Sequence, residues 1–144
     1  MVDIKSNQFF KTRLPAILLV IIILFAVILF SKKSFNNLLG TSDQNITKVL
    51  MRSGSTGNYV ETTDKAKIKE LINLVNNRDY HISLNQASRS GYIYYYDFYS
   101  GDESIIRIMG CGSNVNINGI YYNVSKEISA DSLNNWFNSL PVKQ

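Results

Sequence analysis

Residues 91–110 read GYIYYYDFYSGDESIIRIMG, which are two strand-like runs joined by a turn at residues 100–102. The length of this turn decides the hairpin, because a slip of one residue moves every side chain to the opposite face of the sheet. A two-residue turn would mix polar and apolar side chains on both faces. A three-residue turn pairs Tyr96 with Ile106 and separates the two kinds of side chain cleanly, so we predict that register.

This register gives the hairpin one apolar face and one mixed face. The apolar face is expected to form core under the helices, and it holds Tyr92, Tyr94, Tyr96, Phe98, Ile106 and Ile108. The mixed face is expected to stay open and is our candidate binding patch, which consists of Tyr95, Asp97, Tyr99 and Arg107. Two interpretations of the patch are open. It is either ordinary cross-strand pairing or a surface that recognises a partner protein or a sugar ring.

The rest of the sequence predicts more antiparallel strands and two amphipathic helices. Strand patterns cover residues 46–53, 59–63, 79–86, 114–117 and 120–124. Apolar residues at helical spacing mark the two helices, with Ile68, Leu71, Ile72 and Val75 in the first and Leu133, Trp136, Phe137 and Leu140 in the second. The pair Asn118-Gly119 predicts a type I′ hairpin turn. We therefore predict an α+β fold, a two-layer sandwich in which a meandering antiparallel sheet packs on two helices.

The predicted domain covers residues 46–144, and the polar residues 31–45 before it are expected to form a linker. In the strand pattern at 79–86, Tyr80, Ile82 and Leu84 alternate onto one face. His81 is therefore expected on the open face of the sheet.

Residues 14–30 read LPAILLVIIILFAVILF, a run of 17 residues without a charged or polar side chain. As a helix this run is about 25 Å long, slightly short of a bilayer core of about 30 Å. Phe9 and Phe10 could extend its apolar length. Pro15 is expected in the first helical turn, where its missing N–H costs little. We predict a transmembrane helix.

The flanks of this run predict a retained anchor and its orientation. The run ends in bulky residues where a signal peptidase needs small ones, and it has no nearby cysteine for lipid attachment. Three basic residues precede the run and two follow it, namely Lys5, Lys11 and Arg13, then Lys32 and Lys33. This bias favours a cytoplasmic flank at residues 1–13. We expect a single-pass protein of the cell membrane, with the lipid bilayer as partner of residues 14–30 and the C-terminal domain outside.

Charge argues against one class of partner. The formal net charge is +4, and residues 1–30 account for +2 of it. Residues 31–144 hold 12 basic and 10 acidic side chains and no basic stripe, so the folded part is near neutral. We therefore expect no nucleic-acid binding.

Few residues are candidates for catalysis or metal binding. His81 is the single histidine and Cys111 the single cysteine, which excludes an internal disulfide and leaves no metal-ligand spacing. A Cys–His nucleophile pair is formally possible, but no local motif supports it. We expect no enzyme, no metal and no cofactor.

The layout resembles that of uncharacterised, single-span membrane-anchored proteins of low-GC Gram-positive bacteria, which carry a small extracytoplasmic α+β domain. The stretches that carry this resemblance are TTDKAKIKELINLVNN at 62–77 and IIRIMGCGSNVNINGIYYNVS at 105–125. We expect a non-enzymatic binding or sensing domain whose partner is a protein or another cell-surface component. The alternative is a cell-surface immunity or inhibitor protein that binds a toxin or an enzyme.

Overall fold

The computed structural model describes residues 4–88 and 91–144, with the side chains of residues 4–12 and 28 excepted. The chain divides into two units, Met1–Ser31 and Lys32–Gln144, which we describe separately. The first unit contains the helix α1 (Ile4–Phe30). Because α1 begins at Ile4, Pro15 lies inside the helix and not in its first turn, which corrects our expectation. Among the described residues, no helix combines the length and the apolar character needed to cross a membrane.

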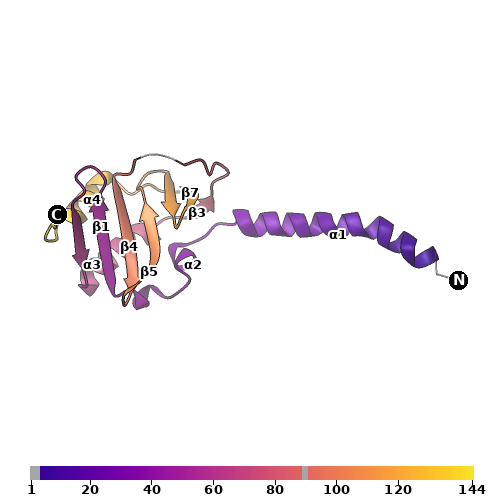
Figure 1. Cartoon of the computed structure of the whole chain (residues 1–144), viewed down its shortest axis with the longest axis horizontal. Coiled ribbons are helices and arrows are strands. Elements are labelled where there is room, and N and C mark those ends of the chain that lie inside the picture. Colours follow the sequence, from indigo (N-terminus) through magenta and orange to yellow (C-terminus); the bar gives the residue numbers. More distant parts are fainter. Residues whose placement is uncertain (1–3, 89–90) are drawn as a thin grey trace. The chain divides into compact units, whose positions relative to one another are not determined.

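The second unit is an α+β fold built on a seven-stranded antiparallel sheet, as the sequence predicts at this level (Figure 1). Its elements are α2 (Phe35–Leu39), a 3₁₀ turn (Asp43–Asn45), β1 (Lys48–Ser53), β2 (Tyr59–Thr62), α3 (Lys65–Asn76), β3 (Tyr80–Ile82), β4 (Tyr94–Ser100), β5 (Glu103–Met109), β6 (Asn114–Ile117), β7 (Ile120–Val124) and α4 (Ala130–Asn138). The strand order is β2-β1-β4-β5-β6-β7-β3.

Both long helices of this unit cover the same face of the sheet, the far face in Figure 1. The apolar stripes predicted for α3 and α4 are buried, apart from Leu140, which is partly buried and lies beyond the end of α4. The ring centroid of Phe137 lies 5.4 Å from that of Tyr94 on β4, and the indole of Trp136 donates to the carbonyl of Lys67 on α3 at 2.9 Å. Neither α3 nor α4 covers the opposite face, which we call the open face.

The hairpin of β4 and β5 has the predicted faces but not the predicted register. Tyr96 pairs with Ile108, not Ile106, and Ser100 pairs with Glu103 across a two-residue turn. A bulge at Ile105 adds one residue to β5 and shifts the register there, so polar and apolar side chains still separate. The predicted three-residue turn was therefore wrong, but the predicted separation of polar and apolar side chains was correct, because the bulge produces it instead.

Tyr92 is not part of the core, contrary to our prediction. Its side chain is 40% exposed, whereas Tyr94, two residues later, is buried. β4 begins only at Tyr94, and Gly91 before it has a positive φ of 88°, so the alternation of the strand does not extend back to Tyr92.

The position of β3 is the main departure from a meander. β3 lies at the sheet edge beside β7, and β1 takes the place beside β4. β3 also ends early, because the Gln86 side-chain amide accepts from the backbone N–H of Tyr121 at 2.9 Å and donates to its carbonyl at 3.0 Å. Leu84 therefore leaves the strand and is 85% exposed, which corrects its assignment to the buried face.

Residues 32–45 belong to the folded unit, although the sequence suggested a linker. Lys33 and Tyr80 exchange two backbone hydrogen bonds of 2.9 Å. Phe35 is fully buried, with its ring centroid 5.2 Å from that of Phe98. The folded unit therefore begins at Lys32 and not near Ile46, and the buried ring of Phe35 is one of the contacts that hold this segment to the core.

The turn between β6 and β7 is confirmed. Asn118 and Gly119 have φ values of 49° and 90°, the two positive values that a type I′ turn requires.

Candidate functional site

The open face of the sheet brings the predicted patch residues together. Tyr95, Asp97 and Tyr99 alternate along β4, and Arg107 lies opposite Asp97 on β5. These strands occupy the middle of the sheet, so the patch lies away from both sheet edges.

Asp97 and Arg107 form a bidentate ion pair on this face. Arg107 Nε donates to Asp97 Oδ1 at 2.6 Å, and Nη2 donates to Oδ2 at 2.7 Å. Asp97 is only 1% exposed, while the Arg107 side chain is half exposed. The hydrogen bonds that Arg107 donates to Asp97 raise the pKa of Arg107 above its ordinary value. Asp97 is therefore a positioning residue that holds a half-exposed guanidinium in place.

The tyrosines of the patch pack against cations and against one another. The guanidinium carbon of Arg107 lies 4.9 Å from the ring centroid of Tyr95, within the range of a cation–π contact. The ring of Tyr92 meets that of Tyr95 edge-on at 5.3 Å, so Tyr92 joins the open face. Lys48 Nζ lies 4.4 Å from the ring centroid of Tyr99. Burial, and then the charge of Asp97, raise the pKa of Tyr99.

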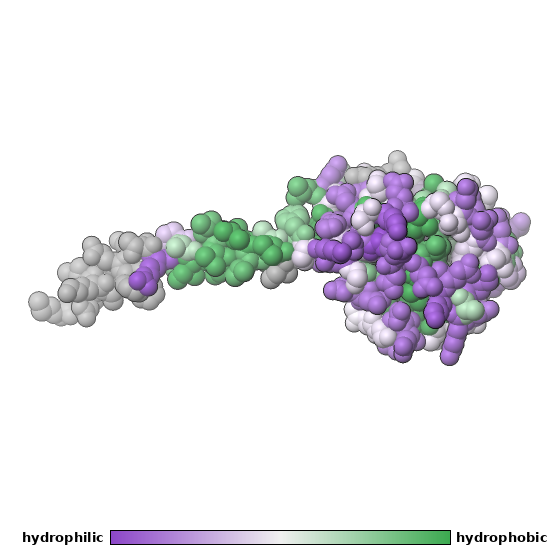
Figure 2. Space-filling view, turned by 180° about the vertical axis from the view of Figure 1, so that it is seen from behind, coloured by the Kyte–Doolittle hydropathy of each residue, from purple (hydrophilic) through white to green (hydrophobic). Residues whose placement is uncertain are grey.

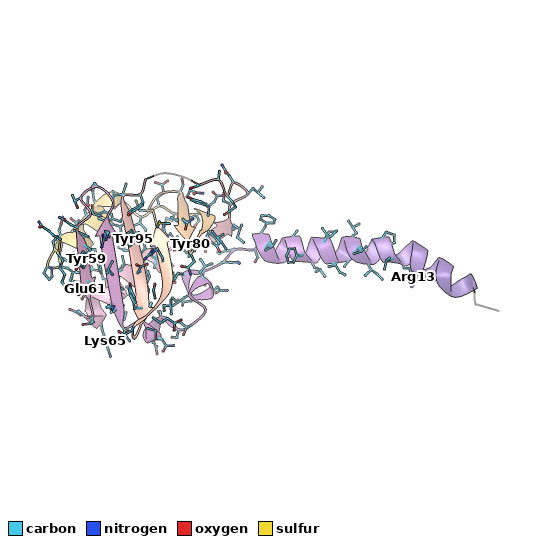
Figure 3. All side chains as sticks on the ribbon, viewed as in Figure 1. Arg13, Tyr59, Glu61, Lys65, Tyr80 and Tyr95 are labelled. Atoms are coloured by element: carbon cyan, nitrogen blue, oxygen red, sulfur yellow. The ribbon has the colours of Figure 1, made fainter. Side chains whose placement is uncertain are left out.

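Sequence reasoning missed the part of this surface that β1 and β2 contribute. Arg52 lies opposite Tyr95 on one side and Tyr59 on the other, and Lys48 lies opposite Tyr99. Figure 3 labels Tyr59 and Tyr95, which come from the two strands that flank β1. The guanidinium carbon of Arg52 is 5.3 Å from the ring centroid of Tyr59. The polar residues that alternate with buried ones along β1 were a usable signal, but nothing in the sequence showed that β1 pairs with β4. We call the whole set the open-face patch, which consists of Lys48, Arg52, Tyr59, Tyr92, Tyr95, Asp97, Tyr99 and Arg107.

One atom of the patch lacks a partner. Arg52 Nε is shielded from solvent, and it is the one buried side-chain nitrogen or oxygen without a hydrogen bond in the part of the chain that the structure describes. A shielded donor left without an acceptor is costly. Packing between Tyr59 and Tyr95 therefore leaves the hydrogen-bonding capacity of Arg52 Nε unsatisfied.

The two residues considered for nucleophilic chemistry are not brought together. Cys111 is buried in the core cluster, and burial raises the pKa of its thiol. His81 is exposed on β3, opposite Asn123. No hydrogen bond links the two among residues 4–88 and 91–144. In the same described range, no three His, Cys, Asp or Glu side chains are grouped so that they could hold a metal ion.

A buried arginine belongs to the core, not to the open face. Arg78 is 4% exposed and donates from Nε to the Tyr80 hydroxyl at 3.0 Å and from Nη2 to the Tyr96 hydroxyl at 3.3 Å. The Tyr80 hydroxyl donates in turn to the carbonyl of Val75 in the last turn of α3. These bonds tie the end of α3 to the sheet, which is a structural role.

A cavity of about 580 Å³ lies on the helical side, between the 3₁₀ turn and α3. Ile46, Ile68 and Ile72 line it together with polar residues that include Lys65 and Lys69. It is separate from the open-face patch.

Comparison with known proteins gave no relatives, since no protein-family model, no curated protein and no solved structure matched the chain significantly. The geometry described above is therefore the basis of the functional argument.

Proposed function

We propose that this chain is a non-enzymatic, single-pass membrane protein that uses the open-face patch of its extracytoplasmic domain to bind a partner. The observation that carries the proposal is the patch itself, where tyrosines and arginines gather on the sheet face that neither α3 nor α4 covers. Tyrosine and arginine are the residue types that, with tryptophan, most often dominate the binding energy of protein interfaces. The resemblance to small membrane-anchored proteins of Gram-positive bacteria agrees with this proposal.

The anchor is supported by the side chains of α1. From Leu14 to Val27, every large apolar residue that the structure describes is between 51% and 62% exposed. Because these include consecutive residues, they lie on all sides of the helix, and Figure 2 shows one of these sides in green. An apolar surface all round a helix needs either protein or lipid to cover it. Residues 14–30 would span about 25 Å, so lipid would have to adapt slightly around them.

Protease treatment of intact cells tests the anchor and the orientation together. The proposal expects the second unit to be degraded from outside while a short N-terminal fragment stays with the membrane fraction. Protection of the second unit would contradict an outside location. Release of the intact chain by high salt would contradict the anchor.

Binding at the open face is tested by site-specific photo-crosslinking in cells. A photoreactive phenylalanine analogue replaces Tyr59 or Tyr95 in the patch, or Asn135 on the exposed side of α4 as a matched control. The proposal expects a discrete crosslinked product from the two patch positions and none from Asn135. Equal products from all three positions, or none from the patch, would contradict it.

The alternative function is a surface immunity or inhibitor protein that binds a toxin or an enzyme. The bidentate contact between Asp97 and Arg107 favours it, because a pre-ordered surface lowers the cost of tight binding. Identification of the crosslinked partner distinguishes the two. A secreted toxin or enzyme whose activity falls on binding would select the alternative.

A further inference from the structure

The charged side chains of the open face do not balance. Six of them reach this face, and they are Lys48, Arg52, Arg107, Lys143, Glu61 and Asp97. Both acids already have a partner, because Asp97 is held by Arg107 and Glu61 by Lys143. Glu61 is also within electrostatic range of Lys48, so Lys48 shares this acid with Lys143, and no ion pair is formed by Arg52 in the described part of the chain. Four cations against two acids leave the face with a net charge of +2.

Two of these cations share one strand. Lys48 and Arg52 are four residues apart on β1, so they point to the same face about 13 Å apart. Leu50 lies midway between them on that face and is half-buried. The order along β1 is thus cation, apolar side chain, cation.

Tyrosine rings flank the two cations across the neighbouring strands. Tyr95 and Tyr59 lie opposite Arg52, and Tyr99 lies opposite Lys48. The Arg52 guanidinium lies over the ring of Tyr59, and its Nε still lacks an acceptor. A carboxylate brought by a partner would supply the missing negative charge at the terminal Nη atoms of this guanidinium, since the shielded Nε is out of its reach.

We infer that the open-face patch binds an extended acidic segment of another protein, in which two acidic residues lie two positions before and two positions after an apolar one. In an extended chain, side chains at alternate positions share a face, and positions four apart lie about 13 Å apart. One carboxylate would therefore reach Arg52, the other Lys48, and the apolar side chain would cover Leu50. This inference rests on the proposed function, since it names the class of partner for the same surface.

A second copy of this chain does not fit the surface. A two-fold interface would place the patch against itself and bring its excess cations together. Like charges that face one another across an interface oppose association. The partner must therefore differ from this chain and carry the opposite charge.

The test measures binding of labelled synthetic peptides to the full chain in detergent micelles by fluorescence anisotropy. The probe peptide carries glutamate, leucine and glutamate at alternate positions among serines and threonines. One control peptide has the same composition with adjacent glutamates, and another has glutamines in place of the glutamates. We expect saturable binding of the probe and clearly weaker binding of both controls. Equal binding of the three peptides, or no saturable binding of the probe at millimolar concentration, would overturn the inference.

Matched variants locate the binding surface. Lys48→Gln with Arg52→Gln removes two charges from the open face, and Lys65→Gln with Lys69→Gln removes the same charge from α3. We expect the first pair to weaken binding on the order of tenfold and the second to leave it within twofold. Equal losses in both would show non-specific attraction and overturn the inference. If the first pair does not fold, Lys48→Gln alone serves, with an expected loss of about threefold.

Two other outcomes separate this inference from the proposed function. Binding of the full chain to phosphatidylglycerol vesicles through Lys48 and Arg52, without binding of the probe peptide, would overturn the acidic protein segment as the ligand. Crosslinks from Tyr95 in cells, without binding of the probe peptide, would leave the proposed function standing and refute only the inference. Absence of both crosslinks and peptide binding would refute the two together.

Discussion

Replacing Arg107 with methionine leaves the carboxylate of Asp97 buried without its cation. The substitution keeps most of the side-chain length and removes the two hydrogen bonds of 2.6 and 2.7 Å. Water can approach only from the side that the guanidinium occupied, because Asp97 is 1% exposed in the intact structure. We therefore expect the variant to be clearly less stable than the parent.

The size of the effect follows from burial and bond count. Removing one partner of a buried ion pair typically costs about 3–5 kcal/mol. Half of the Arg107 side chain is exposed, so water can replace part of what is lost, and we expect about 3 kcal/mol. For a folded unit of this size, such a loss lowers the unfolding temperature by roughly 10 °C.

Thermal unfolding of the full chain in detergent micelles measures this loss through tryptophan fluorescence. Trp136 is the single tryptophan in the sequence, and it lies on the buried side of α4, where it is 1% exposed. It therefore reports on the second unit, whereas far-UV circular dichroism would also include α1.

The double variant Asp97→Asn with Arg107→Met separates a stranded charge from general damage. Asparagine keeps the shape of Asp97 and removes its charge, so the double variant should be more stable than Arg107→Met alone by about 1–2 kcal/mol. If Asp97→Asn instead destabilises the methionine variant as much as it destabilises the parent, the two residues are not coupled and the reasoning fails.

Two further predictions concern the core and its margins. Gly54→Ala should lower stability by about 2 kcal/mol, because its added Cβ would lie 1.9 Å from the carbonyl oxygen of Tyr92; Gly112→Ala, whose Cβ would meet only a side-chain atom at 3.9 Å, is the matched control, and equal melting temperatures would contradict the argument. Burial raises the pKa of Tyr80 and Tyr96 above the ordinary value of 10.0, so the folded state holds these protons more tightly than the unfolded state. Stability should therefore be complete below about pH 10 and fall as the pH rises further. Melting temperatures measured between about pH 8 and pH 11, compared with those of Tyr96→Phe, check this, and an equal decline in both would show that Tyr96 contributes nothing.

Local patterns predicted the faces of the elements well. The alternation in β4 and the helical spacing in α3 are set by which side chains avoid water, and that preference is visible in a single stretch of sequence. Tyr96 and Phe98 are buried and Tyr95 is half-exposed for this reason. The positive φ values at Asn118 and Gly119 were predictable because only a few residue types tolerate them.

Long-range pairing was not predictable in the same way. β3 has only three residues, and it pairs with β7 across about 40 residues of chain, from Tyr80 opposite Val124 to Ile82 opposite Tyr122. The bulge at Ile105 likewise has no strong local signal, although it decides the register of the hairpin. Phe35 was a local signal that the sequence reasoning missed, as was the alternation along β1, since a large aromatic residue in a polar stretch often marks a contact with a core.

The candidate site shows the same division between local and long-range information. Tyr95, Asp97, Tyr99 and Arg107 were found because they alternate within one hairpin. Lys48, Arg52 and Tyr59 were missed because they join the surface only through pairing of β1 with β4 and β2, across more than 40 residues of chain in the first case.

The position of Asp97 also bears on why this face is open at all. β4 is a central strand, and a second apolar layer over it would enclose both Asp97 and Arg107. The guanidinium would then lose the water that now solvates its exposed half, and the desolvation of a complete ion pair often exceeds the attraction within it. Apart from Leu50 and Met109, the apolar surface of this face belongs to tyrosine rings, whose hydroxyls would need hydrogen-bond partners of their own under such a layer. The sequence thus selects against a second helical layer and favours partners that bring polar, charge-complementary groups of their own.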